Sequence, residues 1–468
     1  MKQTKAAQFF SDSRIQEARE KILETLRDHQ KNLVGVRGPN SELNVHYAQC
    51  LKSFSEIRGS KLFFPYLGSG FGNGVFVELG DGSVKYDFIS GIGTHYLGHN
   101  SPDLMLSAID AALRGTVLQG NLQQNVESLD VSKLLLSLAN KKGASFAHCF
   151  LSTSGSMANE NALKLIFQKK YPASRILAFE HCFAGRTIVL SHVTDKPSFR
   201  NGLPPALPVD YVPFFDSKNP KMSLEKSCSI LKNYLSRHPG QHALMMFELI
   251  QGEGGYFEGN RDFFLALIHI LKENKIAVLF DEIQTFGRTS DPFAFQYYAL
   301  DEYADVCTVG KLTQVAATLF KKEWNPAPGL LSQTFTANTA SLFAAKTILS
   351  KLSVENYFGS QGKIMCMHRQ FISHFKKLSK RYPDFIQGPF GVGAMIAFTP
   401  FKGDADKVNQ FAQMLFQNGV IGFVAGANPV RMRFLPPIGA IEMKDVDEVM
   451  KILEATLLEC AALLPTSP

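Results

Sequence analysis

The stretch VLFDEIQTFGRTSD, residues 278–291, decides how the rest of this sequence is read. Its first three residues are strongly apolar, which is typical of a buried strand. The strand then ends in two adjacent carboxylates, Asp281 and Glu282. An acid at a strand end more often caps a loop or helix, but ligands of open α/β sheets also bind at the carboxyl ends of strands. These carboxylates are therefore candidates for ligand binding if other reactive residues meet them there.

Strands and helices alternate around this stretch. ALMMFELI predicts the strand before it, and the predicted helix RDFFLALIHILKENK joins the two. Further strands are expected at ASFAHCFLST, RILAFE, VDYVPF and VCTV, with a helix at MANENALKLIFQKK. Because parallel strands need crossover connections, this alternation predicts an α/β fold with a mainly parallel sheet covered by helices.

The two ends of the chain have a different pattern. Residues 1–65 are mostly polar with apolar residues near helical spacing, and VFVELGDGSVKYDFI predicts a hairpin around Gly-Asp-Gly. Short strands mixed with helices near the C-terminus predict a smaller α+β domain. We therefore expect an N-terminal segment at 1–85 that joins this small domain, a large domain at 86–340 and the C-terminal small domain at 341–468.

Composition excludes several classes of protein. The chain has 468 residues, 45% hydrophobic and 19% charged, an ordinary profile for a folded chain with a large core. The net charge of +7 is dispersed, without the dense basic block of a nucleic-acid binder. No apolar run approaches the roughly 20 residues of a membrane helix, and the N-terminus has no apolar signal core. The seven cysteines are scattered without CxxC, which argues against a metal site or disulfides and fits a reducing cytoplasm.

Two more reactive groups stand at predicted strand ends. In STSGSMANENAL, Ser154, Gly155 and Ser156 follow a strand and open a helix, where free N–H groups and the helix dipole favour a phosphate. Lys311 follows the strand VCTV and can form a Schiff base with a carbonyl if burial removes its proton. The alternatives are a plain helix cap and a solvated lysine. The Gly-rich GSGFGNG, residues 68–74, precedes a strand and is expected to be a loop.

Pyridoxal phosphate needs these groups together: a lysine for its aldehyde, a helix N-terminus for its phosphate and a carboxylate for its pyridine nitrogen. Asp281 fits the last role because a carboxylate keeps that nitrogen protonated, and Glu248 ends the neighbouring strand at the same edge. Gln284 is placed to bond the phenolic oxygen of the ring, and Phe183, in HCFAGRT, to stack on the ring. Together these residues predict a pyridoxal 5'-phosphate site.

The chain resembles the class III aminotransferases, which have the type I fold of pyridoxal-phosphate enzymes. It carries, in the family's order, SGIGTHYLGHNSP, STSGSMANENALK, HCFAGRT, FELIQGEGG, FDEIQTFGRT, VGK and RFLPP. The resemblance implies a seven-stranded sheet in the large domain, Lys311 as the Schiff-base lysine, and the roles given above for Asp281, Phe183 and the helix N-terminus. It also implies that Thr334, in SQTFTAN, reaches the phosphate of a partner subunit, so we expect a homodimer with shared active sites.

The same resemblance suggests how one pocket takes two substrates. Arg433 matches the arginine that binds the α-carboxylate of glutamate, and Glu253 matches the glutamate that covers it when an ω-amine is bound. Arg186 matches an arginine for the donor's distant carboxylate, and Ile92 stands where ornithine aminotransferases tend to carry tyrosine. We expect transfer of an ω-amino group from lysine, acetylornithine, 4-aminobutyrate or a similar donor to 2-oxoglutarate.

Departures from the family's pattern leave the donor open. Met157 stands where the family commonly has Glu, and Thr336 and Ala337 stand where it has Gly-Gly. The run LTQVAA after the reactive lysine is more similar to the lysine ε-aminotransferase branch. The alternatives are a mutase or decarboxylase of the same fold, or a binding protein that has lost the cofactor, which intact Lys311 and Asp281 argue against. A nicotinamide dehydrogenase is disfavoured because no GxGxxG motif opens a helix after a strand.

Overall fold

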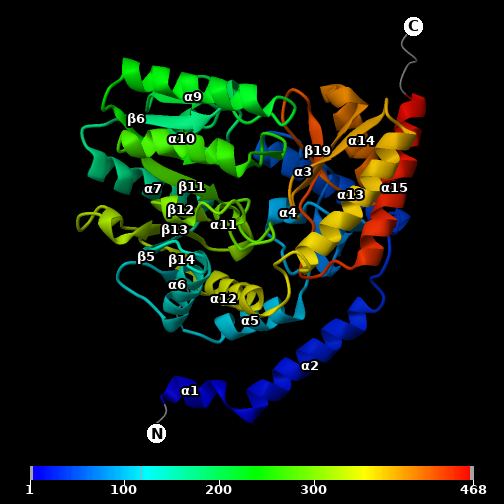
Figure 1. The fold of residues 1–468 in the computed structure, drawn as a ribbon. Helices are drawn as coiled ribbons and strands as arrows, with labels where there is room; N and C mark the ends of the chain where they lie inside the picture. The colour runs from blue at the N-terminus through cyan, green and yellow to red at the C-terminus, as the bar shows by residue number, and fades with distance from the viewer. Residues whose placement is uncertain (1–3, 116–117, 464–468) are drawn as a thin grey trace.

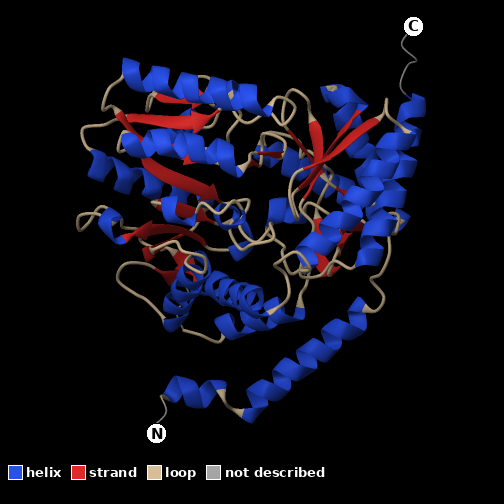
Figure 2. Cartoon of the chain, viewed as in Figure 1, coloured by secondary structure: helices blue, strands red, loops and turns tan. Residues whose placement is uncertain are grey.

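A seven-stranded sheet forms the centre of the larger part of the molecule (Figure 2). The computed structural model describes residues 4–115 and 118–463. Neighbouring strands run parallel except at β13, which is antiparallel to both of its neighbours, β12 and β5. In order across the sheet, the strands are β5 (Phe146–Ser152), β13 (Ala316–Lys321), β12 (Val306–Val309), β11 (Ala277–Glu282), β8 (His242–Phe247), β6 (Arg175–Phe179) and β7 (Val209–Val212). The predicted mainly parallel sheet is confirmed.

Alternate residues of the central strands pack on opposite faces of this sheet, because strand side chains alternate with a period of two. In β11, Val278 and Phe280 belong to a buried cluster that includes α10 (Arg261–Glu273). Leu279 belongs to a second cluster, which includes α7 (Gly155–Lys170). Both faces are buried, which is why this strand is continuously apolar in the sequence.

Further helices and short strands complete the larger part. In Figure 1, α12 lies below the sheet beside α5 and α6, against which it packs. The bounds are α4 (Ser90–Gly93), α5 (Pro102–Ala112), β4 (Leu118–Gln119), α6 (Val126–Ala139), α8 (Ile188–Val193), α9 (Pro220–Arg237), β9 (Ile250–Gln251), β10 (Phe257–Glu258), α11 (Ala294–Tyr297), β14 (Ala337–Asn338) and α12 (Thr339–Val354).

The smaller part uses both ends of the chain, at the right of Figure 1. One antiparallel sheet has the order β15 (Ile386–Phe390), β16 (Ile396–Pro400), β19 (Arg431–Phe434) and β18 (Phe423–Ala425). A second sheet joins the predicted hairpin, β2 (Phe76–Leu79) and β3 (Val84–Asp87), to β17 (Val420–Ile421). The covering helices are α13 (Lys363–Arg381), α14 (Ala405–Gln417) and α15 (Met443–Leu463). The N- and C-terminal segments thus share a sheet, and the boundaries at residues 85 and 340 stay a prediction.

The Gly-rich segment GSGFGNG is not a loop, as we expected, but contains a strand, β1 (Gly68–Asn73). It pairs antiparallel with β2, and the register shifts between Gly68 and Gly72. A Cβ at Gly72 would lie 2.5 Å from Cβ of His99. Glycine is therefore needed here for close packing, and the segment holds no phosphate-binding helix start.

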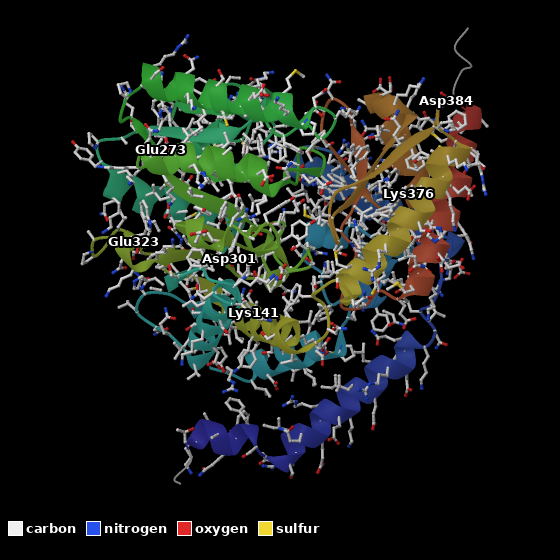
Figure 3. The ribbon with its side chains drawn as sticks, viewed as in Figure 1. Lys141, Glu273, Asp301, Glu323, Lys376 and Asp384 are labelled. Carbon is white, nitrogen blue, oxygen red and sulfur yellow. The ribbon has the colours of Figure 1, made fainter. Side chains whose placement is uncertain are left out.

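Three helices form the N-terminal segment, as the polar pattern of residues 1–65 predicts: α1 (Lys5–Phe10), α2 (Ser13–Gln30) and α3 (Ser41–Arg58). In Figure 1, α1 and α2 lie along the lower side of the molecule, whereas α3 lies higher, beside the smaller part. Figure 3 shows charged side chains such as Glu273 and Lys376 on well-separated elements, in agreement with a dispersed charge. Within the described ranges, no helix is long and apolar enough to cross a membrane.

Candidate active site

The two adjacent carboxylates at the end of β11 have different environments. Asp281 accepts the backbone N–H of Ile283 at 2.9 Å and the side-chain amide of Asn159 at 2.9 Å. Glu282 instead accepts the N–H groups of Ala294 and Phe295, at 3.0 and 2.8 Å, at the start of α11. Glu282 therefore has a structural role, and Asp281 is the carboxylate available for chemistry.

Asn159 is a residue of this site that the sequence interpretation missed. It is buried on α7, and its Nδ2 also donates to the carbonyl of Ala184 at 2.8 Å. The hydroxyl of Thr308, on β12, donates to Asn159 Oδ1 at 2.7 Å and so fixes which end of the amide faces Asp281. The available signal was a polar amide on the sheet-facing side of a predicted helix.

Burial shifts the pKa of both central groups. Burial raises the pKa of Asp281 to about 6, and no cationic side chain of the described ranges forms an ion pair with it. Burial, followed by the nearby charge of Arg433, lowers the pKa of Lys311 to about 8. Lys311 begins the short turn Lys311–Thr313 directly after β12. A lysine with this lowered pKa loses its proton far more readily near neutral pH than an ordinary lysine, which suits a base or nucleophile.

The N-terminus of α7 lies open beside the loop that follows β11. Ser154 is its N-cap, and its hydroxyl accepts the backbone N–H three residues on at 3.3 Å. A Cβ at Gly155 would lie 2.9 Å from Cγ2 of Ile283, and one at Gly185 would lie 2.6 Å from Oγ of Ser156. Small residues thus let three segments converge at a helix start that favours an anion.

Glu248 holds two loops in place through hydrogen bonds at the edge of the site. Its Oε2 accepts the N–H of Phe183 at 2.7 Å and its Oε1 that of Gly252 at 3.1 Å. Burial, together with the charge of Asp281, raises the pKa of Glu248 to about 8. This carboxyl positions Phe183 and the loop that contains Gly252. A direct contact between Glu248 and a cofactor stays a prediction.

Arg433 and Glu253 form an ion pair, as the resemblance implied. Nη2 of Arg433 lies 2.6 Å from Oε1 of Glu253. Nη1 donates to the carbonyl of Gly252 at 3.1 Å and to Oε1 of Gln284 at 3.4 Å. The guanidinium side chain is 0% exposed and that of Glu253 34% exposed, so the carboxylate is the outer member of the pair.

The three remaining predicted residues lie outside this cluster of contacts. Arg186 is exposed and its guanidinium stacks 3.4 Å above the ring of Phe199. Thr334 is exposed on the surface of the chain. Ile92, on α4, has φ +58, and α4 packs against the turn that carries Lys311. A β-branched residue in this region is strained, which marks a constrained position close to the reactive lysine.

Arg288, in the stretch of residues 278–291, is a buried structural residue. Its Nη1 donates to the carbonyl of Pro436 at 2.9 Å and its Nη2 to that of Gly93 at 2.8 Å. The side chain is 1% exposed and lies 5.1 Å from the centre of the Tyr96 ring. The Gly-Arg-Thr sequence after Gln284 therefore joins three distant segments around the site.

A cavity of about 830 Å³ adjoins the cluster. It lies between the segments that follow β6 and β7 and the loop that follows β18. Phe183, Glu253 and Lys196 line it, whereas Asp281 and Lys311 do not. The cavity thus adjoins the site at two residues: Phe183, which is predicted to stack on the ring, and Glu253, which pairs with Arg433.

Comparison with known proteins identifies the family. Residues 69–457 match the class III aminotransferases. The acetylornithine aminotransferases of Methanocaldococcus jannaschii and Listeria innocua are each 28% identical, over 83% and 82% of this chain and 92% and 94% of theirs. A solved lysine aminotransferase from M. tuberculosis has a TM-score of 0.76 at 21% identity, over 88% of this chain and 99% of its own. An ornithine aminotransferase from Toxoplasma gondii has a TM-score of 0.72 at 22% identity, over 85% of this chain and 91% of its own.

The residues of the site fit pyridoxal 5'-phosphate, the cofactor of this family. The buried Asp281, which forms no ion pair with any described side chain, suits a protonated ring nitrogen. Lys311, with its lowered pKa, suits the aldehyde, and the open start of α7 at Gly155 suits the phosphate. Matched over most of its length and equipped for this cofactor, the chain belongs to the class III aminotransferases, which are pyridoxal-phosphate-dependent transaminases.

Proposed function

We propose that this enzyme transfers the ω-amino group of an amino acid to 2-oxoglutarate and so yields a semialdehyde and glutamate. The covered arginine is the observation that carries the proposal. Glutamate needs Arg433 for the carboxylate beside its amine, whereas an ω-amine presents only hydrogens there. A buried guanidinium without a partner is costly, so a pocket for both substrates needs a cover that is present for one and absent for the other. Glu253, 2.6 Å from Arg433, supplies it.

Glu253 is the member of the pair that can move. It lies between Gly252 and Gly254 in a loop, and its side chain is partly exposed. Arg433 is held on strand β19, with ring centres of Tyr256 and Phe423 at 5.8 and 5.7 Å from its guanidinium carbon. The arginine therefore keeps its place when the carboxylate leaves.

The side chains of the chain divide the work of the reaction among them. Bound pyridoxal phosphate supplies an aldehyde for the amine and a ring that accepts electrons from the substrate. With the cofactor bound, Lys311 Nζ would move the proton of the substrate carbon that bears the amine. Asp281, aligned by Asn159, would hold the ring nitrogen in its protonated form. Phe183 would hold the ring by stacking, and Arg433 would orient the carboxylate of glutamate or 2-oxoglutarate by a forked contact.

Acetylornithine, lysine and 4-aminobutyrate are the donors we propose. Named relatives include acetylornithine aminotransferases, and Ile92 in place of tyrosine makes free ornithine a less favoured donor. Arg186 is the proposed contact for the donor's distant carboxylate. We further propose a homodimer in which Thr334 reaches the partner's phosphate, and a cytoplasmic location, which suits seven free cysteines.

Separate half-reactions test the proposed function. The holoenzyme is mixed with each ω-amine, and the loss of the cofactor's visible absorption is followed in a single turnover. Addition of 2-oxoglutarate is expected to restore the absorption and to release glutamate. A donor that reacts while 2-oxoglutarate restores nothing, or that releases carbon dioxide, would favour the mutase or decarboxylase alternative.

Glu253→Ala tests the covered arginine directly. Without the carboxylate, Arg433 stays open, so the half-reaction with glutamate is expected to hold or improve. The half-reaction with the ω-amine is expected to slow by about 1–3 kcal/mol in activation free energy, the worth of one charged hydrogen bond. Single-turnover spectra of both half-reactions measure this, and equal slowing of both would mean that Glu253 is structural.

A further inference from the structure

The open form of the arginine needs a second place for the carboxylate of Glu253. Glu253 lines the cavity of about 830 Å³, and its side chain is 34% exposed. The cavity therefore has room for this carboxylate once it leaves Arg433. A carboxylate that moves into a partly enclosed space is most stable where a cation meets it.

Lys196 stands in the wall of the same cavity. It is exposed, and within the described ranges no ion pair includes it. Its Nζ lies 4.6 Å from the centre of the Phe199 ring, and that ring packs edge-on to Phe183 with centroids 6.4 Å apart. Lys196 thus has an unpaired ammonium on a flexible stem beside the ring-stacking candidate.

Two acidic side chains of the cavity, Asp195 and Asp216, already accept backbone hydrogen bonds. Asp195 accepts the backbone N–H of His181 at 2.8 Å, and Asp216 accepts that of Lys218 at 2.9 Å. Lys226 is a second lysine that lines the cavity. The charges of Arg433, Lys311 and Lys196 hold the pKa of Glu253 below its ordinary value, against the opposing effect of burial.

We propose that Lys196 is the second ionic partner of Glu253, which alternates between Arg433 in the ω-amine half-reaction and Lys196 in the glutamate half-reaction. This inference rests on the proposed function and extends it to a residue that contacts neither substrate nor cofactor. Lys196 acts as a positioning residue: it stabilises the open form and so keeps Arg433 available for a dicarboxylate.

Lys196→Met tests the proposal because it removes the charge and keeps the stem. An exposed ion pair changes a population by about two- to fivefold. Calorimetric titration of the holoenzyme with glutarate, a dicarboxylate without amine or keto group, is expected to show binding weaker by about that factor. The KM for glutamate should rise by a similar factor at unchanged kcat, while the ω-amine half-reaction holds or improves. Lys196→Arg should bind glutarate like the unmodified enzyme.

Two controls separate this role from a general effect. Lys226→Met removes another lysine of the same cavity and is expected to leave glutarate binding unchanged. In a Glu253→Ala background, Lys196→Met should have no further effect, because the partner is gone. Three results would overturn this inference and leave the proposed function intact. They are an effect of Lys196→Met that persists in the Glu253→Ala background, an effect equal to that of Lys226→Met, and no effect of Lys196→Met although glutarate still binds. Failure of glutarate to bind and of glutamate to react would instead overturn the proposed function.

Discussion

The two adjacent carboxylates at the end of β11, Asp281 and Glu282, have different roles in this enzyme. The pleat of β11 turns Asp281 toward α7 and the site, and Glu282 toward the start of α11. Burial then adjusts the chemistry, because it raises the pKa of Asp281 and lowers that of Lys311. A lysine whose charge is buried destabilises the folded protein at neutral pH, so the reactive residue works against the stability of the fold.

Lys311→Met is expected to stabilise the cofactor-free protein at pH 7. The folded pKa of about 8 lies below the ordinary value of 10.5, so the unfolded chain binds more protons between these values. The charged, buried lysine therefore lowers the free energy of unfolding by its full amount below pH 8, and this loss disappears as the pH rises toward 10.5. We expect a gain on the order of 1–3 kcal/mol at pH 7 and almost none at pH 10.5, measured from denaturant midpoints. A gain that does not change with pH would show that the effect is packing alone.

Asn159→Ala is expected to weaken cofactor binding by about tenfold or more, because Asp281 loses a hydrogen bond to its charged form. The pKa of Asp281 should rise, so the loss should be larger at lower pH. Equilibrium binding of the cofactor at several pH values measures both effects. Asn161→Ala is the matched control: it lies on the same helix, is equally buried, and donates to Ser152 instead. Equal weakening by both variants would point to damage to α7.

At the scale of elements, the site depends on loops that the sheet alone does not fix. Glu248, at the end of β8, holds the backbone of Phe183 and of Gly252 through its two oxygens. Backbone hydrogen bonds hold another loop in place. Next to Gly98, His99 and Gly74 exchange reciprocal N–H···O bonds, at 3.1 and 2.8 Å. These contacts connect the turn between β1 and β2 to the segment that follows α4.

Gly98→Ala is expected to destabilise the protein by about 2–4 kcal/mol. The residue has φ +80, and a Cβ would lie 2.6 Å from the carbonyl oxygen of Gly74 and 2.7 Å from Cβ of Ala440. Gly38→Ala is the control, because nothing lies within 4 Å of its Cβ position and its φ is ordinary. Denaturant midpoints of the two variants should differ clearly, and similar midpoints would show that the turn relaxes without cost.

At the scale of the whole molecule, the site lies where the two parts meet. Asp281 lies on β11 of the large sheet and Lys311 in the turn after β12, whereas Arg433 lies on β19 of the smaller part. Arg288 connects the parts through the carbonyls of Gly93 and Pro436. The proposed homodimer adds a third source, because Thr334 lies on the surface of its own subunit.

Mixing two defective variants tests the shared site. Lys311→Ala is expected to be inactive, and Thr334→Ala to bind cofactor weakly. If Thr334 serves the partner's site, a dimer of one chain of each kind has one intact site and one with both defects. Refolding an equal mixture should then restore about a quarter of normal activity at low cofactor concentration. Activity no higher than that of Thr334→Ala, diluted by inactive chains, would place the threonine in its own subunit's site or outside both.

Local sequence patterns predict the alternation of strands and helices, the strand-end positions of Asp281, Glu248 and Lys311, and the helix start at Ser154. These follow from local patterns, since a strand buried on both faces is continuously apolar and chemistry collects at strand ends. The folded chain was needed to show that Asn159 aligns Asp281, and that Glu282 and Arg288 are structural. It also showed that the Gly-rich segment at 68–74 contains a strand, and that Lys196 shares a cavity with Glu253. These depend on contacts between residues far apart in the chain, which no local spacing encodes.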